Sequence, residues 1–272
     1  TMQRTVFYIS GSTGITAEKL GQSLLAQFDN VAFDHVPLPF IDTLEKAQDA
    51  VMMINIAGQK DDVRPIVFDT LINKEIKAAF KTVNALFIDV FGTYLKPLES
   101  ELLSNPLQQS GMSHRISEED KYYQRIQAMN FALSNDDGAR TNQYNNADII
   151  LTGVSRCGKT PICLYLALQF GIRAANYPLT MDDIETGNLP KILVTHRAKL
   201  FGLTTEPERL SKVRNERQAN SRYAALRQCR YEIDEAEQIL DRLRVPYLNT
   251  SNQSIEEIAS KMMAATGLVK RY

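Results

Sequence analysis

The residues best suited to chemistry in this sequence form the run GVSRCGKT, from Gly153 to Thr160. Its G-x-x-x-x-G-K-T spacing is that of a P-loop, in which successive backbone N–H groups point inward and bind phosphate oxygens. Gly153 and Gly158 permit backbone angles and a close approach that a side chain would block. Lys159 can reach the terminal phosphate, and the Thr160 hydroxyl can bind Mg²⁺. We therefore expect a nucleotide- or polyphosphate-binding loop rather than a purely structural turn.

Every residue of this run is a candidate phosphate contact, because the backbone amides contribute as much as the side chains. The predicted phosphate-binding residues are Gly153, Val154, Ser155, Arg156, Cys157, Gly158, Lys159 and Thr160. Lys159 is also a catalytic candidate, and Thr160 is the candidate metal ligand. The Arg156 side chain could neutralise phosphate charge, although a solvated arginine is an equally good interpretation.

Two adjacent acids, Asp136 and Asp137, precede the loop by less than twenty residues. Acids before a glycine are commonly turn residues. Phosphoryl transfer to a hydroxyl, however, benefits from a carboxylate that accepts the proton or holds Mg²⁺. Composition alone favours the turn interpretation. Asp89 ends an apolar run and could also be a metal-binding acid, but a simple strand-end role is the better interpretation.

An arginine-rich stretch belongs to a long helical segment predicted over residues 207–243, and it allows two interpretations. It could be a lid that faces phosphate, or a solvated helix face paired with neighbouring glutamates. The arginines are Arg209, Arg214, Arg217, Arg222, Arg227 and Arg230, and the glutamates are Glu206, Glu208, Glu216 and Glu232. The sequence does not favour either interpretation or any single member.

The loop needs a strand before it and a helix after it, and the sequence predicts both. ADIILTG, residues 147–153, is typical of a buried strand, and TPICLYLALQFG, residues 160–171, of a helix that ends at Gly171. The first half shows a similar pattern, with RTVFYIS as a strand, GSTG as a tight turn, and ITAEKLGQSLLAQF as a helix. The GSTG turn, Gly11 to Gly14, could bind an anion, but a plain strand-to-helix turn is favoured.

Strands alternate with helices in both halves, which predicts parallel sheets covered by helices on both faces. The alternation is interrupted between residues 98 and 138, where polar residues, prolines and glycines accumulate. We therefore predict a two-domain α/β protein. An N-terminal parallel-sheet α/β domain spans residues 1–140 and is the candidate target-binding part. A C-terminal P-loop kinase-like α/β domain spans residues 141–272.

Composition limits the possible partners and location. The formal net charge is −1, so no global basic field indicates nucleic-acid binding. No apolar run approaches the roughly 18–20 residues that span a bilayer, so we expect no membrane segment. The start TMQRTVFYIS enters a strand-like run directly, and we expect no signal peptide. Three cysteines without a paired spacing indicate a reducing cytoplasm and no disulfides.

Several stretches resemble one protein family. GVSRCGKTPICLYLALQFGIRAANYPL, FGLTTEPERLSKVRNER, NSRYAALRQCRYE and the N-terminal FYISGSTGITAEKLG are similar to the bacterial phosphoenolpyruvate synthase regulatory proteins, also called pyruvate, water dikinase regulatory proteins. The resemblance covers nearly the whole chain. SRCGKTP inside the loop points to the synthase branch rather than to the related regulators of pyruvate, phosphate dikinase.

The resemblance implies a bifunctional enzyme with phosphoenolpyruvate synthase as its protein substrate. The kinase activity uses ADP to phosphorylate a threonine beside the catalytic histidine of the target and so inactivates it. The opposing activity uses inorganic phosphate, releases pyrophosphate and restores the target. Mg²⁺ is the expected metal. The resemblance favours a functional role over the turn interpretation for Asp136 and Asp137, and both become catalytic candidates.

This chain departs from the family pattern at two positions. The family usually has His-Asp-Asp-Gly where this chain has Asn135, Asp136, Asp137 and Gly138, and it usually has Asp where this chain has Gly11. Asparagine keeps hydrogen bonding but cannot take up a proton near neutrality. An essential histidine base would therefore be missing here, whereas a merely positioning histidine would be replaced.

Two other functions compete with this interpretation. One is a P-loop kinase of a small metabolite, which would need a closed acceptor pocket. The other is a nucleotide-sensing protein without catalysis, which the two departures keep open. The sequence leaves the oligomeric state open, with a homodimer as one candidate.

Overall fold

The computed structural model describes residues 2–106 and 118–271 of the chain. The chain divides into two compact units, residues 1–116 and 117–272. The sequence placed this boundary near residue 140, later than the structure does. The difference arises because helix α5 (Glu118–Ser134) packs on helix α6 (Lys159–Phe170) of the second unit and buries Ala128 and Ala132 in its core.

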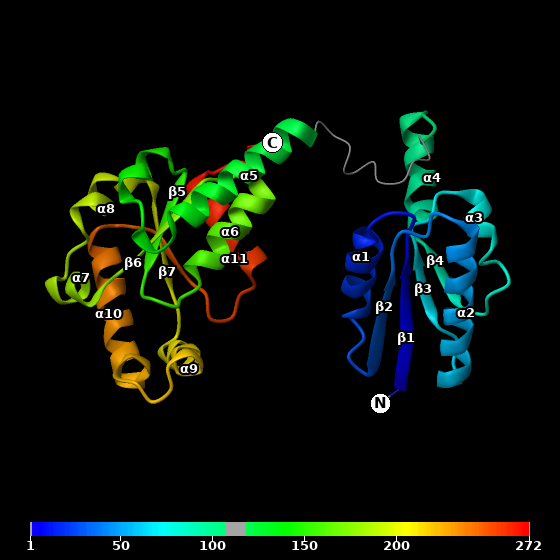
Figure 1. Cartoon of the computed structure of the whole chain (residues 1–272), viewed down its shortest axis with the longest axis horizontal. Helices are drawn as coiled ribbons and strands as arrows, with labels where there is room; N and C mark the ends of the chain where they lie inside the picture. Colours follow the sequence, from blue (N-terminus) through cyan, green and yellow to red (C-terminus); the bar gives the residue numbers. More distant parts are fainter. Residues whose placement is uncertain (1, 107–117, 272) are drawn as a thin grey trace. The chain divides into compact units, whose positions relative to one another are not determined.

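The first unit is a parallel sheet with helices on both faces (Figure 1). Its four strands pair in the order β2-β1-β3-β4. The elements are β1 (Met2–Ile9), α1 (Ile15–Leu25), β2 (Val31–Leu38), α2 (Leu44–Asp61), β3 (Ile66–Asp69), α3 (Lys74–Ala78), β4 (Leu86–Asp89) and α4 (Val90–Leu102).

Alternate residues of β1 belong to two separate hydrophobic cores, because successive side chains of a strand point to opposite faces of the sheet. Phe7 and Ile9 pack with residues of α2 and α3 on one face of the sheet. Val6 and Tyr8 pack with residues of α1 and with Val90 of α4 on the other. A central strand that is apolar on both faces is what a parallel sheet between two helical layers needs.

The second unit repeats this design, with its parallel strands in the order β6-β5-β7-β8. Helices α5, α6 and α11 lie on one side of the sheet and α10 on the other (Figure 1). Besides α5 and α6, the elements are β5 (Ile149–Gly153), β6 (Ala174–Pro178), α7 (Met181–Thr186), α8 (Lys191–Thr195), β7 (Leu200–Thr204), α9 (Pro207–Arg217), α10 (Leu226–Arg242), β8 (Tyr247–Asn249) and α11 (Ile255–Thr266).

The strand order positions the P-loop. The chain leaves β5 for β6 on one side and later returns to β7 on the other, so the loop after β5 lies where the winding direction switches. Ligands of open α/β sheets bind at this point, beyond the carboxyl ends of the strands. The two-domain parallel α/β fold predicted from the sequence is therefore confirmed, and its topology puts residues 153–158 at the edge best suited to binding.

The GSTG turn occupies the corresponding place after β1 in the first unit. Its backbone is hydrogen-bonded to the segment after β2, with Phe40 N donating to Ser12 O and Ile41 N donating to Ser10 O. The Ser10 hydroxyl accepts from Ser12 N at 3.1 Å. These hydrogen bonds within the first unit account for the conformation of the turn.

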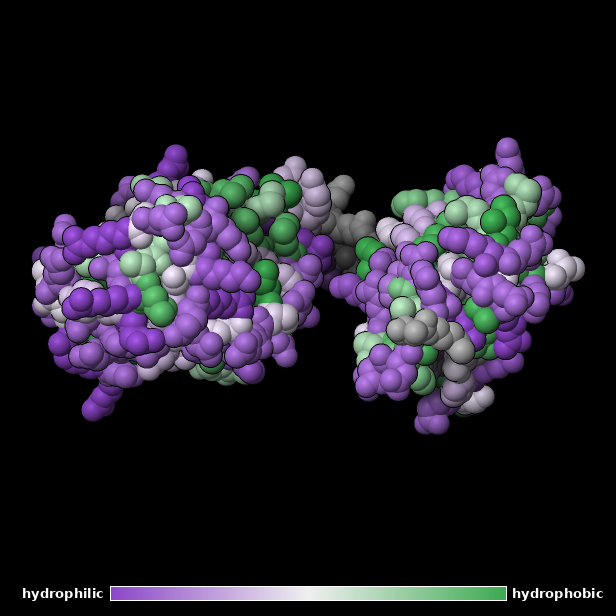
Figure 2. All heavy atoms as spheres, turned by 90° about the horizontal axis from the view of Figure 1, so that it is seen from below, coloured by the Kyte–Doolittle hydropathy of each residue, from purple (hydrophilic) through white to green (hydrophobic). Residues whose placement is uncertain are grey.

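Hydrophilic residues cover most of the face of each unit in Figure 2, with hydrophobic residues gathered in smaller groups. In the part of the chain that the structure describes, no helix combines the length and apolar character needed to cross a bilayer. Cys157, Cys163 and Cys229 are buried and carry free thiols.

Candidate functional site

The P-loop joins β5 to α6, and both of its glycines adopt left-handed backbone angles. Gly153 has φ 145° and Gly158 has φ 95°. A Cβ atom at Gly153 would lie 2.1 Å from the backbone oxygen of Leu203 in β7, so no side chain fits there. The side chains of Val154 and Cys157 are buried, which leaves their backbone amides as the groups a phosphate could contact. The two glycines therefore have backbone angles that a residue with a side chain rarely adopts.

Lys159, the first residue of α6, lies against the start of the loop. Its side chain is 4% exposed. The Nζ atom donates to Val154 O at 2.7 Å and to Gly153 O at 3.1 Å. Backbone carbonyls at the start of the loop therefore satisfy the ammonium group.

Asp136 lies beside Thr160, at the end of the P-loop. Thr160 Oγ1 donates to Asp136 Oδ1 at 2.8 Å. Asn176 Nδ2, from the buried strand β6, donates to the same oxygen at 2.5 Å. The structure therefore brings together the two residues that the sequence singled out for Mg²⁺ and acid chemistry, although 24 positions separate them.

Asp137 has a different environment. It is exposed, and its backbone N–H donates to Asn176 Oδ1 at 3.0 Å. Its φ of 48° is left-handed, a conformation that aspartate tolerates better than most residues. Asn176 thus holds both acids, one through a carboxylate and one through the backbone, and it leaves the Asp137 carboxylate facing outward.

Asn135 is fully buried behind the acids. Its Nδ2 donates to Phe131 O at 2.9 Å and to Gln143 Oε1 at 3.2 Å. Its Oδ1 is buried without a hydrogen-bond partner among the described residues. The Asn135 side chain therefore ties the end of α5 to the segment before β5.

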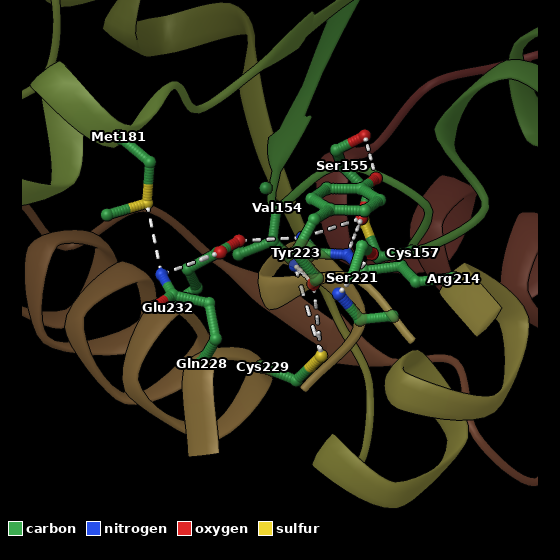
Figure 3. A network of polar contacts seen from close by, with 12 residues as sticks. Val154, Ser155, Cys157, Met181, Arg214, Ser221, Tyr223, Gln228, Cys229 and Glu232 are labelled. Carbon is green, nitrogen blue, oxygen red and sulfur yellow. Dashed lines mark hydrogen bonds and ion pairs between the residues drawn. The ribbon is translucent and has the colours of Figure 1, made fainter. Parts of the chain in front are cut away.

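A buried arginine supports the P-loop from behind (Figure 3). Arg214 of α9 is 0% exposed. Its Nη2 donates to Ser155 O at 3.1 Å and to Glu232 Oε2 at 2.6 Å. The Tyr223 ring lies 4.0 Å from the guanidinium carbon, and its hydroxyl donates to Ser155 Oγ at 3.0 Å. Backbone and side chain of Ser155 are therefore both fixed by residues outside the loop.

Two pKa shifts follow from this packing. Burial opposes the charge of Arg214, but the hydrogen bond to Glu232 and its negative charge outweigh it and raise the pKa of the guanidinium. Burial raises the pKa of the Cys163 thiol to about 12, although a hydrogen bond from Asn176 lowers it. Arg214 thus stays cationic, and Cys163 behaves as a small apolar residue beneath the site.

The structure separates the arginine-rich stretch into members with different roles. Arg214 is the buried support just described. Arg230 forms an exposed ion pair with Glu208 at 3.0 Å, as the solvated-face interpretation expected. Residues 206–232 are not one long helix, since α9 ends at Arg217 and α10 begins at Leu226.

Asp89 is held by neighbours within its own unit. It lies in the first unit, where its Oδ1 accepts from Gly92 N at the start of α4 and its Oδ2 pairs with Lys77 at 2.7 Å. The strand-end interpretation therefore holds for this acid.

Sequence reasoning missed Asn176, Tyr223 and the specific pairing of Arg214 with Glu232. One signal was available for Asn176, because an asparagine in the apolar run IRAANYP is unusual in a strand that must be buried. The roles of Tyr223 and Arg214 depend on contacts between α9, α10 and the loop, which have no local pattern.

The residues at the site fit a magnesium ion that arrives with a substrate. Thr160 and Asp136 offer oxygen ligands, which Mg²⁺ prefers, and their oxygens lie 2.8 Å apart. Among residues 2–106 and 118–271, no group of three or more His, Cys, Asp and Glu side chains is arranged to hold a metal. Mg²⁺ commonly uses one or two protein oxygens together with water and substrate phosphates, so a larger protein cage is not required.

The chain is similar to known proteins along nearly all of its length. The model of a family described as kinase/pyrophosphorylase matches residues 6–263. A protein of Pseudomonas savastanoi pv. phaseolicola named "Putative phosphoenolpyruvate synthase regulatory protein" is 54% identical over 271 residues, which is 100% of both chains. Proteins of the same name from Pseudomonas fluorescens and Hahella chejuensis are 53% and 54% identical and cover 100% and 98% of both chains. On this evidence, the chain belongs to the kinase/pyrophosphorylase family.

Proposed function

We propose that this protein is a bifunctional regulator of phosphoenolpyruvate synthase. In one direction it transfers the β-phosphoryl group of ADP to a threonine of the synthase, and in the other it transfers that group from phosphothreonine to inorganic phosphate. The observation that carries the proposal is the contact of Thr160 with Asp136 at the end of the P-loop. It is supported by the family and by the names of the full-length relatives.

The kinase reaction balances as a direct displacement. The threonine Oγ forms a bond to the β-phosphorus, the bond from that phosphorus to the bridging oxygen breaks, and AMP leaves. The threonine proton needs an acceptor, and the exposed Asp137 carboxylate is the group we assign to it. Lys159 and the loop amides stabilise the charge on the transferred phosphoryl group.

The opposing reaction uses the same phosphorus. An oxygen of inorganic phosphate forms the new bond, the bond to threonine Oγ breaks, and pyrophosphate and free threonine result. A loop that binds a diphosphate can hold pyrophosphate as readily as the phosphates of ADP. One loop therefore serves both directions. In this second reaction Asp137 takes the proton that the attacking phosphate gives up and passes it to the leaving threonine oxygen.

Mg²⁺ fits the proposal as a partner of the phosphates. When bound, it neutralises charge on the phosphate oxygens and orients them. Thr160 and Asp136 would hold it, and Asn176 fixes Asp136 in place through its 2.5 Å hydrogen bond. The N-terminal unit is our candidate for recognition of the synthase surface.

One assay tests this function. Phosphoenolpyruvate synthase carrying phosphohistidine is incubated with the protein, Mg²⁺ and ADP, and phosphothreonine on the synthase is measured. Phosphothreonine should appear with ADP and disappear when phosphate is added with ADP removed, with pyrophosphate released. The matched control is Lys159→Ala, which should lose at least about 10²-fold in both directions. Full forward activity of that variant would remove the loop from the mechanism.

A further inference from the structure

The turn that carries the two acids is bonded to β6, an outer strand of the second sheet. The backbone N–H of Asn176 donates to Asn135 O at 3.2 Å, where the turn begins. The Asn176 side chain donates to Asp136 Oδ1 at 2.5 Å and accepts from the backbone N–H of Asp137 at 3.0 Å. These hydrogen bonds hold the turn as far as the amide of Asp137, and the carboxyl side of that residue depends on a different contact.

Tyr177, the next residue of β6, makes that contact with Gly138. A Cβ atom at Gly138 would lie 3.0 Å from Tyr177 Cδ2 and 3.3 Å from Tyr177 Cε2, so the ring lies directly against the glycine. Both Asp137 and Gly138 are left-handed, with φ 48° and 73°. Glycine has more backbone freedom than any other residue, and a ring packed on it restricts a position that would otherwise move easily.

The Tyr177 ring is itself fixed at its far end. Its hydroxyl donates to Asp183 Oδ2 at 3.3 Å. The same carboxylate oxygen accepts from the backbone N–H and the hydroxyl of Thr180, at 2.9 Å and 2.8 Å, where α7 begins. Burial and the negative charge of Asp183 raise the pKa of the Tyr177 hydroxyl, so it remains a donor. The strand holds one end of the ring and the start of α7 holds the other.

We infer that Tyr177 is a positioning residue for the proposed transfer reaction, because its ring holds Gly138 and thereby orients the Asp137 carboxylate. The inference rests on the proposed function, in which Asp137 exchanges the threonine proton, and it adds a residue that does not itself contact the substrate. A carboxylate that takes up a proton must lie within hydrogen-bond distance of it. Displacement of a reacting group by about 1 Å can cost about 10²-fold in rate.

Steady-state kinetics of the kinase reaction on the full-length protein test this role. Tyr177→Ala should lower kcat about 30-fold, because the turn loses the ring that restrains it. The KM for the synthase and the affinity for inorganic pyrophosphate should change less than about twofold, since the P-loop is untouched.

Two further single variants serve as references. Tyr177→Phe keeps the ring and should retain kcat within about threefold, because Asp183 still accepts from Thr180. Tyr231→Ala removes an exposed tyrosine of α10 and should leave kcat unchanged.

A double variant separates positioning from a general effect on the fold. Asp137→Asn removes the group through which Tyr177 is inferred to act. Tyr177→Ala added to Asp137→Asn should therefore lower kcat no further than Asp137→Asn alone. If the two losses multiplied, Tyr177 would act independently of Asp137 and the inference would be overturned.

The remaining outcomes are also decisive. A Tyr177→Ala variant with the kcat of the parent protein would overturn the positioning role and leave the proposed reaction intact. Loss of pyrophosphate binding together with kcat in Tyr177→Ala would show a purely structural role and also overturn it. If the unmodified protein formed no phosphothreonine with ADP, the proposed function would fail and this inference with it.

Discussion

Thr160 and Asp136 are joined by a hydrogen bond of 2.8 Å, so the last residue of the P-loop contacts an acid from the turn that follows α5. The chain between them passes through β5 and the whole loop. Asn176 donates to the same carboxylate oxygen from a third segment. Loop, acid and supporting amide therefore form one unit, and this unit is what the following predictions test.

Asp136→Asn should lower the Mg²⁺-dependent kinase rate by about 10²-fold, because the neutral amide is a poorer Mg²⁺ ligand. The fold should survive, since an amide oxygen can still accept from Thr160 and Asn176. Rates should be measured across a Mg²⁺ titration. Asp182→Asn, an exposed acid of α7, is the control. A variant with normal rate and normal Mg²⁺ dependence would exclude Asp136 as a ligand.

Arg214→Met should lower the free energy of unfolding by about 3 kcal/mol, because Glu232 would be left buried without its partner. It should also weaken pyrophosphate binding, because Ser155 loses its support. The double variant Arg214→Met with Glu232→Gln should recover much of the stability but not the affinity. Denaturant unfolding and calorimetry measure the two effects. If the double variant recovered both its stability and its affinity for pyrophosphate, Arg214 would stabilise the fold without positioning the loop.

Asn135→His should leave the pH dependence of both reactions unchanged. The sequence allowed two roles for a histidine at this position, and the structure favours positioning, because the Asn135 side chain is buried and bonded to Phe131 and Gln143. Rates of variant and parent protein should be compared from about pH 5.5 to about pH 9. A new ionisation near about 6.5 together with a faster reaction would show that an imidazole here exchanges protons with substrate.

Cys163 should make the second unit less stable at alkaline pH. Burial raises the pKa of its thiol from 9.0 to about 12, so the folded state keeps a proton that the unfolded state loses. The stability contributed by this difference is complete below about pH 9 and is lost as pH rises toward about 12. Cys163→Ala and Cys163→Ser should both show a shallower decline in the free energy of unfolding between about pH 8 and about pH 10.5. If both variants showed the same slope as the parent protein, the raised pKa of the Cys163 thiol would be contradicted.

Local patterns in the sequence were sufficient where local interactions decide the structure. The glycine spacing of the loop predicted backbone angles that a side chain would not allow, and both glycines adopt them. Gly171 was correctly placed at the end of α6, where φ is 65°. The alternation of strands and helices predicted two parallel sheets. In each case the residues that determine the feature are close together in the chain.

Local patterns failed where distant contacts outweighed them. The sequence predicted an interruption of the strand and helix pattern from residue 98, but α4 spans Val90–Leu102 and contains Pro97. Asp89 begins this helix by accepting from Gly92, and Val90 packs into the core of the first unit. Burial and end capping here outweigh the loss of one backbone donor at the proline.

The candidate site also combines features set by neighbouring residues with features set by contacts between distant segments. The sequence by itself indicated which residues could bind phosphate, because the glycine and lysine spacing that predicts such a loop lies in one continuous stretch. Only the tertiary structure decided that Asp136 contacts Thr160, and that Arg214 is buried while Arg230 forms an exposed ion pair. The order of the strands sets which segments meet. Two arginines of one stretch therefore differ, because the fold gives Arg214 a buried carboxylate partner and leaves the ion pair of Arg230 in solvent.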